Sequence, residues 1–276
     1  MKKYLFILLV SFQVMAQTDL NVMSYNIRLG SANDGENSWN IRKEKVTELI
    51  NYYEASFIGL QEVQKFQLDF ILKESPNYDY IGLPREEGEF AEYSCILYNK
   101  NDFKVLQEKT IWLSTTPDTI SRGWDAACNR IVTYGLFQSK KTKKKFWIAN
   151  THFDHVGTKA RLESAKMIAD LVAELKQSEN VPFILSGDFN ATTDEDSMKI
   201  LQTEFNEASS SSTTKPYGEL GTWNAFDFKT KPSRQIDYIF FDKKASIKVR
   251  KFITINDFYD FKYPSDHLPI LATFSY

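Results

Sequence analysis

Short apolar runs that stop at polar residues dominate the sequence. Such runs predict β-strands over 20–27, 56–60, 80–82, 93–98, 103–113, 131–137, 146–150, 181–185, 236–241 and 247–255, and the segment 265–269 opens a last strand that ends near Thr273. Helical spacing predicts a helix with Ile41, Val46, Leu49, Ile50 and Tyr53 on one face, a short helix around 66–71, a long one over 162–175 capped by Thr158, and a short one over 194–201. Many strands, few helices, and both crossovers and hairpins favour two sheets packed face to face with helices outside.

The connecting segments differ in composition. The segment 84–90 is a charged loop with a glycine, and 205–221 is a polar loop rich in Ser and Thr. The irregular segment 114–129 is long, and loops of that length in compact domains often carry function. The segment 222–226 could present an aromatic face to a ligand or form a packed corner. No repeat or linker divides residues 17–276, so one domain is expected.

The first sixteen residues have the organisation of a secretion signal. Lys2 and Lys3 form a positive start, 4–14 is apolar but too short to span a bilayer, and 14–16 offers small residues for cleavage. We therefore expect a signal peptide at 1–16, a mature protein that starts at Gln17, and a secreted or periplasmic location. An uncleaved anchor is the alternative. The mature chain contains no further run that could cross a membrane.

Charge and cysteine content narrow the function only slightly. Lys and Arg number 34 against 36 Asp and Glu, a net charge of −2 that becomes about −4 without the signal. That balance argues against a broad grip on duplex DNA, although a local basic groove remains compatible with it. Cys95 and Cys128 could pair after export, but their apolar or strand-like surroundings favour free thiols. Their spacing is not that of a metal site.

Asp188 and Asn190 follow the apolar run 181–185 and Gly187. Ligands of α/β proteins bind beyond the carboxyl ends of strands, where an Asp could accept a proton from water and an Asn could hold that water or a phosphate. The same two residues could instead bond their own backbone in a turn.

Other polar residues occur where predicted strands begin or end. The whole set is Asn26, Glu62, Arg130, His152, Asp154, Asp188, Asn190, Asp237, Asp266 and His267. Glu62 taken alone could be a solvated acid, and Asp237 inside a strand needs a partner. Brought together, these oxygen-rich side chains suit Mg²⁺ or Mn²⁺ and the cleavage of phosphoesters. The sequence contains neither a Gly-x-Ser-x-Gly elbow nor a P-loop.

Six short motifs resemble the endonuclease/exonuclease/phosphatase family and come in that family's order. They are Ser24–Ile27, Gly59–Glu62, Asn150–Phe153, Ser186–Asn190, Gln235–Tyr238 and Ser265–Pro269. The segments 111–114 and 123–126 resemble an uncharacterised secreted bacterial branch nearest the deadenylase-like members. The resemblance implies a four-layer α/β sandwich, with two packed mixed sheets flanked by helices as in deoxyribonucleases, and an active site at one end of the sheets.

The resemblance also implies roles for the metal and the water. Glu62 would be the principal ligand of Mg²⁺ or Mn²⁺ with Asn26 beside it, and Asp266 would serve the metal or the water. Asp188 would orient or deprotonate the attacking water. Asn190 would hold that water or the phosphate.

The remaining roles concern the phosphate. His267 would contact the scissile phosphate and Asp237 would orient His267, which accounts for an acid in an apolar strand. His152 would grip the phosphate from the other side with help from Arg130. The pair 154–155 matches the family less tightly and is equally compatible with a polar strand end.

Departures from the family narrow the substrate. The signatures of inositol phosphatases are absent around 191–192 and 235–238, and no aromatic hairpin typical of membrane-active sphingomyelinases is obvious. We therefore expect a secreted phosphodiesterase or nuclease acting on single-stranded nucleic acid or nucleotides, with no stable protein partner. A phosphomonoesterase acting on a sugar or lipid headgroup is the alternative, and a non-catalytic ligand-binding relic is the third possibility.

Overall fold

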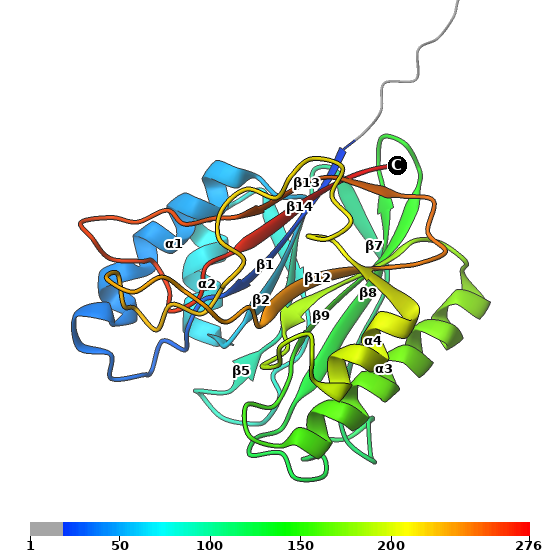
Figure 1. Ribbon diagram of the computed structural model, residues 1–276, viewed down its shortest axis with the longest axis horizontal. Coiled ribbons are helices and arrows are strands. Elements are labelled where there is room, and N and C mark those ends of the chain that lie inside the picture. Colours follow the sequence, from blue (N-terminus) through cyan, green and yellow to red (C-terminus); the bar gives the residue numbers. More distant parts are fainter. Residues whose placement is uncertain (1–18) are drawn as a thin grey trace, which may run out of the picture.

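The computed structural model describes residues 19–276 as two six-stranded β-sheets with helices on their outer faces (Figure 1). The expected signal peptide, 1–16, and the expected mature start at Gln17 lie outside the described residues. The four-layer α/β sandwich expected from the resemblance is confirmed.

The strands are distributed over two large sheets and one small ribbon. The first sheet has the order β13-β14-β1-β2-β6-β4, with β1 (Asp19–Asn26), β2 (Phe57–Gln61), β4 (Tyr78–Ile81), β6 (Ile96–Asn99), β13 (Lys248–Thr254) and β14 (Ile270–Ser275). The second has the order β11-β12-β10-β9-β8-β7, with β7 (Phe103–Trp112), β8 (Ile131–Ser139), β9 (Lys145–His152), β10 (Phe183–Asp188), β11 (Phe205–Glu207) and β12 (Asp237–Asp242). The ribbon pairs β3 (Val63–Gln64) with β5 (Glu92–Tyr93).

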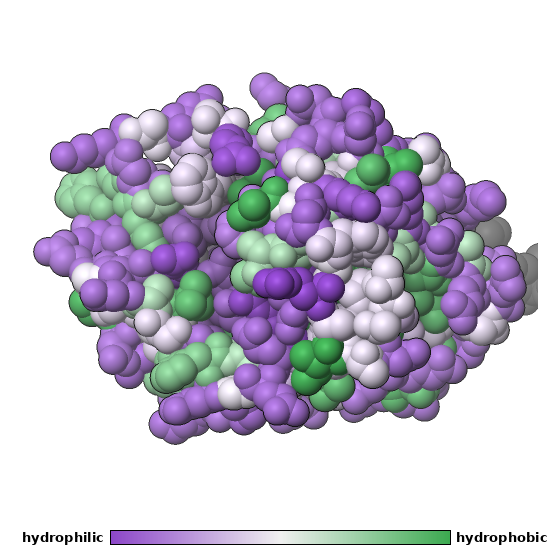
Figure 2. Space-filling view, turned by 90° about the horizontal axis from the view of Figure 1, so that it is seen from below, coloured by the Kyte–Doolittle hydropathy of each residue, from purple (hydrophilic) through white to green (hydrophobic). Residues whose placement is uncertain are grey.

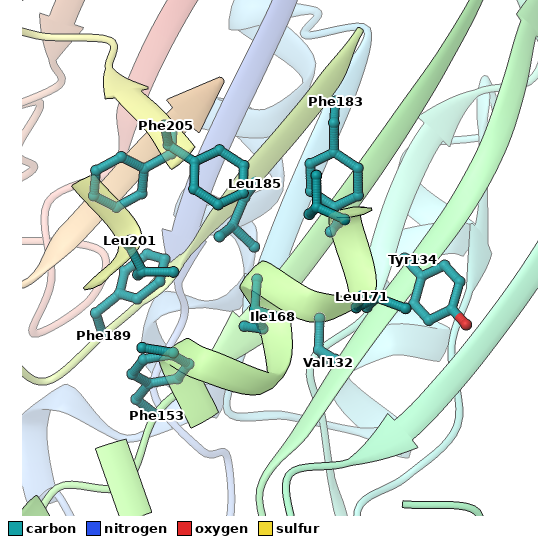
Figure 3. Packing of buried hydrophobic residues seen from close by; sticks show 14 of the residues in the cluster. Val132, Tyr134, Phe153, Ile168, Leu171, Phe183, Leu185, Phe189, Leu201 and Phe205 are labelled. Carbon is teal, nitrogen blue, oxygen red and sulfur yellow. The ribbon is translucent and has the colours of Figure 1, made fainter. Parts of the chain in front are cut away.

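The helices are α1 (Trp39–Tyr53), α2 (Lys65–Glu74), α3 (Thr158–Ser178) and α4 (Asp196–Glu204), with a short 3-10 helix, η1 (Gly35–Asn37). Three buried apolar clusters hold the layers together. One lies between the two sheets, one between the second sheet and α3 and α4, and one between the first sheet and α1 and α2. In Figure 3, Ile168 and Leu171 of α3 lie among the side chains of the second sheet, near Leu185 and Val132. Burial of a large apolar side chain contributes about 1.5–3 kcal/mol, so these interfaces are the main source of stability.

Strand direction places the predicted site residues at one end of the sheets. β1 and β2 are parallel, as are β9 and β10, so Asn26, His152 and Asp188 end their strands at the same edge. β12 runs antiparallel to β10 and pairs Asp237 with Asp188. Asp237 is therefore the first residue of its strand and lies at that edge too, rather than in the strand interior as the sequence suggested.

Asn150 connects the two sheets directly beneath this edge. Its side-chain nitrogen donates to the carbonyl oxygens of Leu60 and Cys95, both at 2.8 Å, and its oxygen accepts from Gln61 at 2.7 Å. Gly59 permits this close approach, because a Cβ there would overlap Ser186 and Asn150. Several residues of the recognised motifs thus hold the sheets together rather than face a ligand.

Three predicted segments differ from the structure. The strand predicted over 93–98 is divided between β5 of the ribbon and β6 of the first sheet, because residues 92–93 pair with 63–64 and the chain joins the first sheet only at Ile96. The segment 205–221, predicted as a loop, begins with the edge strand β11, which pairs with β12. The last strand starts at Ile270, after the polar segment 265–269.

Two helix details were also wrong. Ile41, placed on the apolar face of the first helix, is 58% exposed, and Arg42 beside it is buried. Thr158 is the first residue of α3 and not its cap. The free N–H groups of Lys159 and Ala160 instead donate to Asp125, a carboxylate from the long 114–129 segment.

Candidate active site

The edge where Asn26, His152, Asp188 and Asp237 meet forms the floor of a pocket of about 400 Å³. Figure 2 views the molecule from below, and the surface on this side is hollowed. Glu62, Arg130, Asn190, Asp266 and His267 also line the pocket or its floor, so nine of the ten polar residues singled out from the sequence come together there.

Asp188 lies at the centre of the pocket floor. Its Oδ2 accepts from Asn26 Nδ2 at 3.0 Å and lies 3.5 Å from His152 Nε2 and 3.7 Å from His267 Nε2. Burial, together with the nearby Asp237 carboxylate, raises the pKa of Asp188 to about 7. A carboxylate in this condition is matched to accepting a proton near neutral pH.

Local packing fixes the direction of Asp188. Phe189 is fully buried, and its ring centroid lies 5.0 Å from that of Phe153 in the cluster beneath α3. Asn190 follows with φ at +49°, in the left-handed region, and its N–H donates to Asp188 Oδ1 at 3.0 Å. The self-bonded turn that the sequence left open is therefore present, and the Asn190 side chain still reaches the pocket.

His267 is paired with Asp237. Its Nδ1 lies 2.9 Å from Asp237 Oδ2, and both side chains are buried. Burial by itself lowers the pKa of His267, but the carboxylates of Asp237 and Asp188 outweigh it and raise the pKa well above its usual value. The protonated form of His267 is therefore favoured.

The pKa of His152 is shifted in the opposite direction to that of His267. Burial, and then the guanidinium groups of Arg130 and Arg85, lower the pKa of His152 well below its usual value. Asn190 Nδ2 lies 3.0 Å from His152 Nε2 and donates to the carbonyl oxygen of Phe153 at 3.0 Å. The pKa values of His152 and His267 thus shift in opposite directions because their neighbours differ.

Glu62 and Asp266 form the acidic side of the pocket, near Arg28. Glu62 accepts from Asn26 Nδ2 at 3.1 Å and from the N–H of Leu29 at 3.0 Å. Arg28 lies 4.0 Å from Glu62 and 3.9 Å from Asp266, too far for hydrogen bonds, because its guanidinium is bound to Asp34. Two carboxylates that converge without a closely bound cation suit a divalent metal, so the donor set fits Mg²⁺ or Mn²⁺. Asn26 orients the Glu62 carboxylate by donating from its NH₂ group. The Asn26 side-chain oxygen accepts from the N–H of Arg28.

Asp154 belongs to the support of the pocket. Its carboxylate accepts from the N–H groups of Ala127, Cys128, Val156 and Gly157 at 2.7–3.2 Å, and from Arg130 Nε at 3.3 Å. These donors use its lone pairs, so the nearby Cys128 and His155 do not make a metal site with it. Within residues 19–276, both cysteines are free.

Arg130 is held by this support and is only 4% exposed. Its Nη2 lies 3.0 Å from His155 Nδ1. Its Nη1 is buried and has no hydrogen-bond partner within the described part of the chain. A buried guanidinium nitrogen without a protein partner needs an ordered water or a ligand oxygen to satisfy it.

Sequence reasoning missed several residues of the pocket, Arg234 among them. Arg28 and Leu29 follow the first strand, and Arg85 and Glu92 belong to the charged 84–92 region. Trp223, which the sequence left as a ligand face or a packed corner, is 40% exposed and lines the pocket with Arg234, whose guanidinium lies 5.9 Å from the indole centroid.

Comparison with known proteins agrees with this geometry. Residues 23–267 match the model of the endonuclease/exonuclease/phosphatase family. A solved family protein from Bacteroides thetaiotaomicron is 32% identical, with 94% of this chain and 96% of that chain covered and a TM-score of 0.89. A mannosyl-6-phosphatase from the same organism is also 32% identical, with 93% and 100% covered and a TM-score of 0.89. Mouse nocturnin is 24% identical over 95% of this chain, which spans 66% of nocturnin's length.

A two-sheet sandwich with an acidic pocket holding histidines defines a class of phosphoester hydrolases. The chain belongs to the endonuclease/exonuclease/phosphatase family, whose members catalyse such reactions. Within residues 19–276, none of the helices has the length and apolar character needed to cross a membrane.

Proposed function

We propose that the protein is a phosphoester hydrolase that depends on Mg²⁺ or Mn²⁺ and uses Asp188 to activate water. The proposal depends on one observation: Asp188 lies within 4 Å of both His152 and His267, and its pKa is raised to about 7. A carboxylate with this pKa can act as the general base that takes the proton of an attacking water. Asn190 holds the water or a phosphate oxygen.

Glu62 and Asp266 would hold the cation, and the NH₂ group of Asn26 fixes the Glu62 carboxylate at 3.1 Å. The bound cation would neutralise phosphate oxygens and lower the cost of the negative charge that develops on them. His267, kept protonated by Asp237, donates to the scissile phosphate. We assign His152 and Arg130 to the opposite side of the phosphate.

A phosphomonoester with a small polar leaving group is the substrate that we favour. Arg85 and Arg130 border the pocket at one wall and Trp223 at another, so the space of about 400 Å³ suits a compact ligand. The likeness to a mannosyl-6-phosphatase over the full length of that chain supports a sugar phosphate.

A nuclease is the second candidate. The exposed indole of Trp223 with Arg234 beside it could stack on a base, and nocturnin and Ccr4 exoribonucleases are among the relatives. A panel of hexose 6-phosphates, p-nitrophenyl phosphate, bis(p-nitrophenyl) phosphate, single-stranded RNA and sphingomyelin separates the candidates. The highest kcat/KM on a hexose 6-phosphate supports the phosphomonoesterase. Processive shortening of RNA with little monoester turnover would favour the nuclease.

A further inference from the structure

The pocket wall formed by Arg85 and Glu92 is not used by the proposed chemistry. Arg85 Nη2 donates to Glu92 Oε1 at 2.7 Å, and the two side chains are 12% and 13% exposed. Both line the pocket that holds the site.

The backbone at this wall is held from three directions. The N–H of Arg85 donates to the Glu92 carbonyl at 2.9 Å. The Arg85 carbonyl accepts from Trp112 Nε1 at 2.7 Å and from Asn129 Nδ2 at 3.3 Å. Trp112 belongs to the 111–114 motif, and Gly123 of the other branch motif packs so closely on the Leu113 carbonyl that a Cβ would overlap it. The segments 111–114 and 123–126 therefore support the backbone of Arg85. A residue that determines substrate specificity needs such a fixed position.

The charge of this wall points to the kind of group that it binds. Arg85 is paired with Glu92, and Arg130 with Asp154 at 3.3 Å. Each guanidinium is thus balanced by a carboxylate, so the wall adds little net charge for a second phosphate. It instead presents donors and an acceptor side by side, which matches hydroxyl groups, since each hydroxyl both donates and accepts. The buried Arg130 Nη1 is a further donor that no group within residues 19–276 satisfies.

We propose that Arg85 and Glu92 bind hydroxyl groups of the substrate's leaving group, so that the site selects phosphomonoesters of polyols. This inference rests on the proposed function and names its substrate class. Arg85 and Glu92 are specificity residues, because neither takes part in the transfer of the phosphoryl group to water.

The test compares a hexose 6-phosphate with p-nitrophenyl phosphate, which has no hydroxyl groups on its leaving group. Arg85→Met and Glu92→Gln should each raise KM for the hexose phosphate by about tenfold or more, since each removes a charge-assisted hydrogen bond. On p-nitrophenyl phosphate, the kcat/KM of Glu92→Gln and of Arg85→Lys, which keeps the positive charge near His152, should stay within about threefold of the wild type. Glu86→Gln is the matched control: Glu86 lies 3.5 Å from Arg85 but does not line the pocket, so neither substrate should be affected.

Several results would overturn the inference. Equal losses of kcat/KM on both substrates would show that Arg85 and Glu92 only support the structure. An unchanged KM for the hexose phosphate would show that they do not contact it. If Glu92→Gln lowers KM for a hexose bisphosphate, the wall binds an anion instead. If Arg85→Met has a lower melting temperature than the wild type, Arg85→Lys replaces it as the test variant. Lysine keeps the positive charge but lacks the planar guanidinium, so Arg85→Lys should still be less selective for the hexose phosphate. A wild type inactive on every phosphoester would refute the proposed function, whereas activity without hydroxyl selectivity would refute only this inference.

Discussion

His267 Nδ1 and Asp237 Oδ2 are 2.9 Å apart in a buried pair, and this contact fixes which nitrogen of His267 faces the pocket. The other nitrogen, Nε2, lies 3.7 Å from Asp188. Asp237→Asn should therefore reduce turnover by roughly a hundredfold or more, because Asn cannot stabilise the imidazolium. Melting temperature should change little, since Asn keeps the shape and one acceptor. Steady-state kinetics and thermal melts measure the two effects.

The same substitution should change the pH profile. The Asp237 carboxylate raises the pKa of His267 against the opposing effect of burial, so its removal lowers that pKa. Protonated His267 is then lost at lower pH, and the alkaline limb of kcat should move to lower pH. His267→Ala should cost at least as much activity, and the double mutant should be little worse than His267→Ala. Multiplicative losses in this cycle would show that the two residues act independently.

Glu62→Gln tests the assignment of the metal. The Glu62 carboxylate should bind a divalent cation directly. Even the loss of a residue that only hydrogen-bonds to a metal ligand lowers metal affinity by about 10–100-fold. We expect the dissociation constant for Mn²⁺ to rise at least about tenfold, measured by calorimetry, with an unchanged circular dichroism spectrum. Glu44→Gln, on the exposed face of α1, serves as the control. An unchanged Mn²⁺ affinity in Glu62→Gln would show that the metal binds at another site.

Asp154 should contribute stability and not catalysis. Although burial opposes ionisation, the backbone donors of Gly157, Ala127 and Val156 and the charge of Arg130 lower the pKa of Asp154 below its usual value. A lowered pKa stabilises the fold above the unfolded pKa of about 4, and that stability is lost as pH falls through the folded pKa. Asp154→Asn should thus cost about 2–4 kcal/mol at pH 7 and progressively less below about pH 4.

Chemical denaturation at several pH values measures this difference. Asp196→Asn is the matched control, because that aspartate is 80% exposed and its ion pair with Lys199 should contribute little. A cost for Asp154→Asn that is independent of pH would contradict the role assigned to its charge.

We also propose that the protein is exported and that residues 1–16 are removed. Mass spectrometry of the exported protein should show a chain that begins at Gln17. Retention of Met1 in the exported form would contradict the proposal, and protein found only inside the cell would contradict export.

Much of the site could be predicted because apolar strand patterns end sharply. The run before Asp188 and the pair Gln61–Glu62 mark strand ends, whereas Asp266–His267 precede a strand. Parallel pairing of β1 with β2 and of β9 with β10, together with the antiparallel pairing of β14 with β1, brings these positions to one edge. The motifs in family order supplied the two-sheet architecture. What each residue does in the reaction remains a prediction.

The rest depends on contacts between distant segments. Arg85 and Glu92 lie in a charged stretch without periodicity, and only the pairing of β5 with β3 brings them to the pocket. Asp154 looked like a weak site residue, but backbone donors from Ala127 and Cys128, on a separate loop, occupy its carboxylate. Thr158 failed as a cap because Asp125 arrives from another loop. No local pattern signals any of these.

The most direct measurement is the metal dependence of phosphoester hydrolysis by the purified protein. After dialysis against EDTA, the protein should not turn over p-nitrophenyl phosphate, and added Mg²⁺ or Mn²⁺ should restore activity. Asp188→Asn should stay at least about a thousandfold slower at saturating metal, because the base is gone. Full activity in excess chelator, or in Asp188→Asn with metal, would contradict metal-dependent hydrolysis at this site.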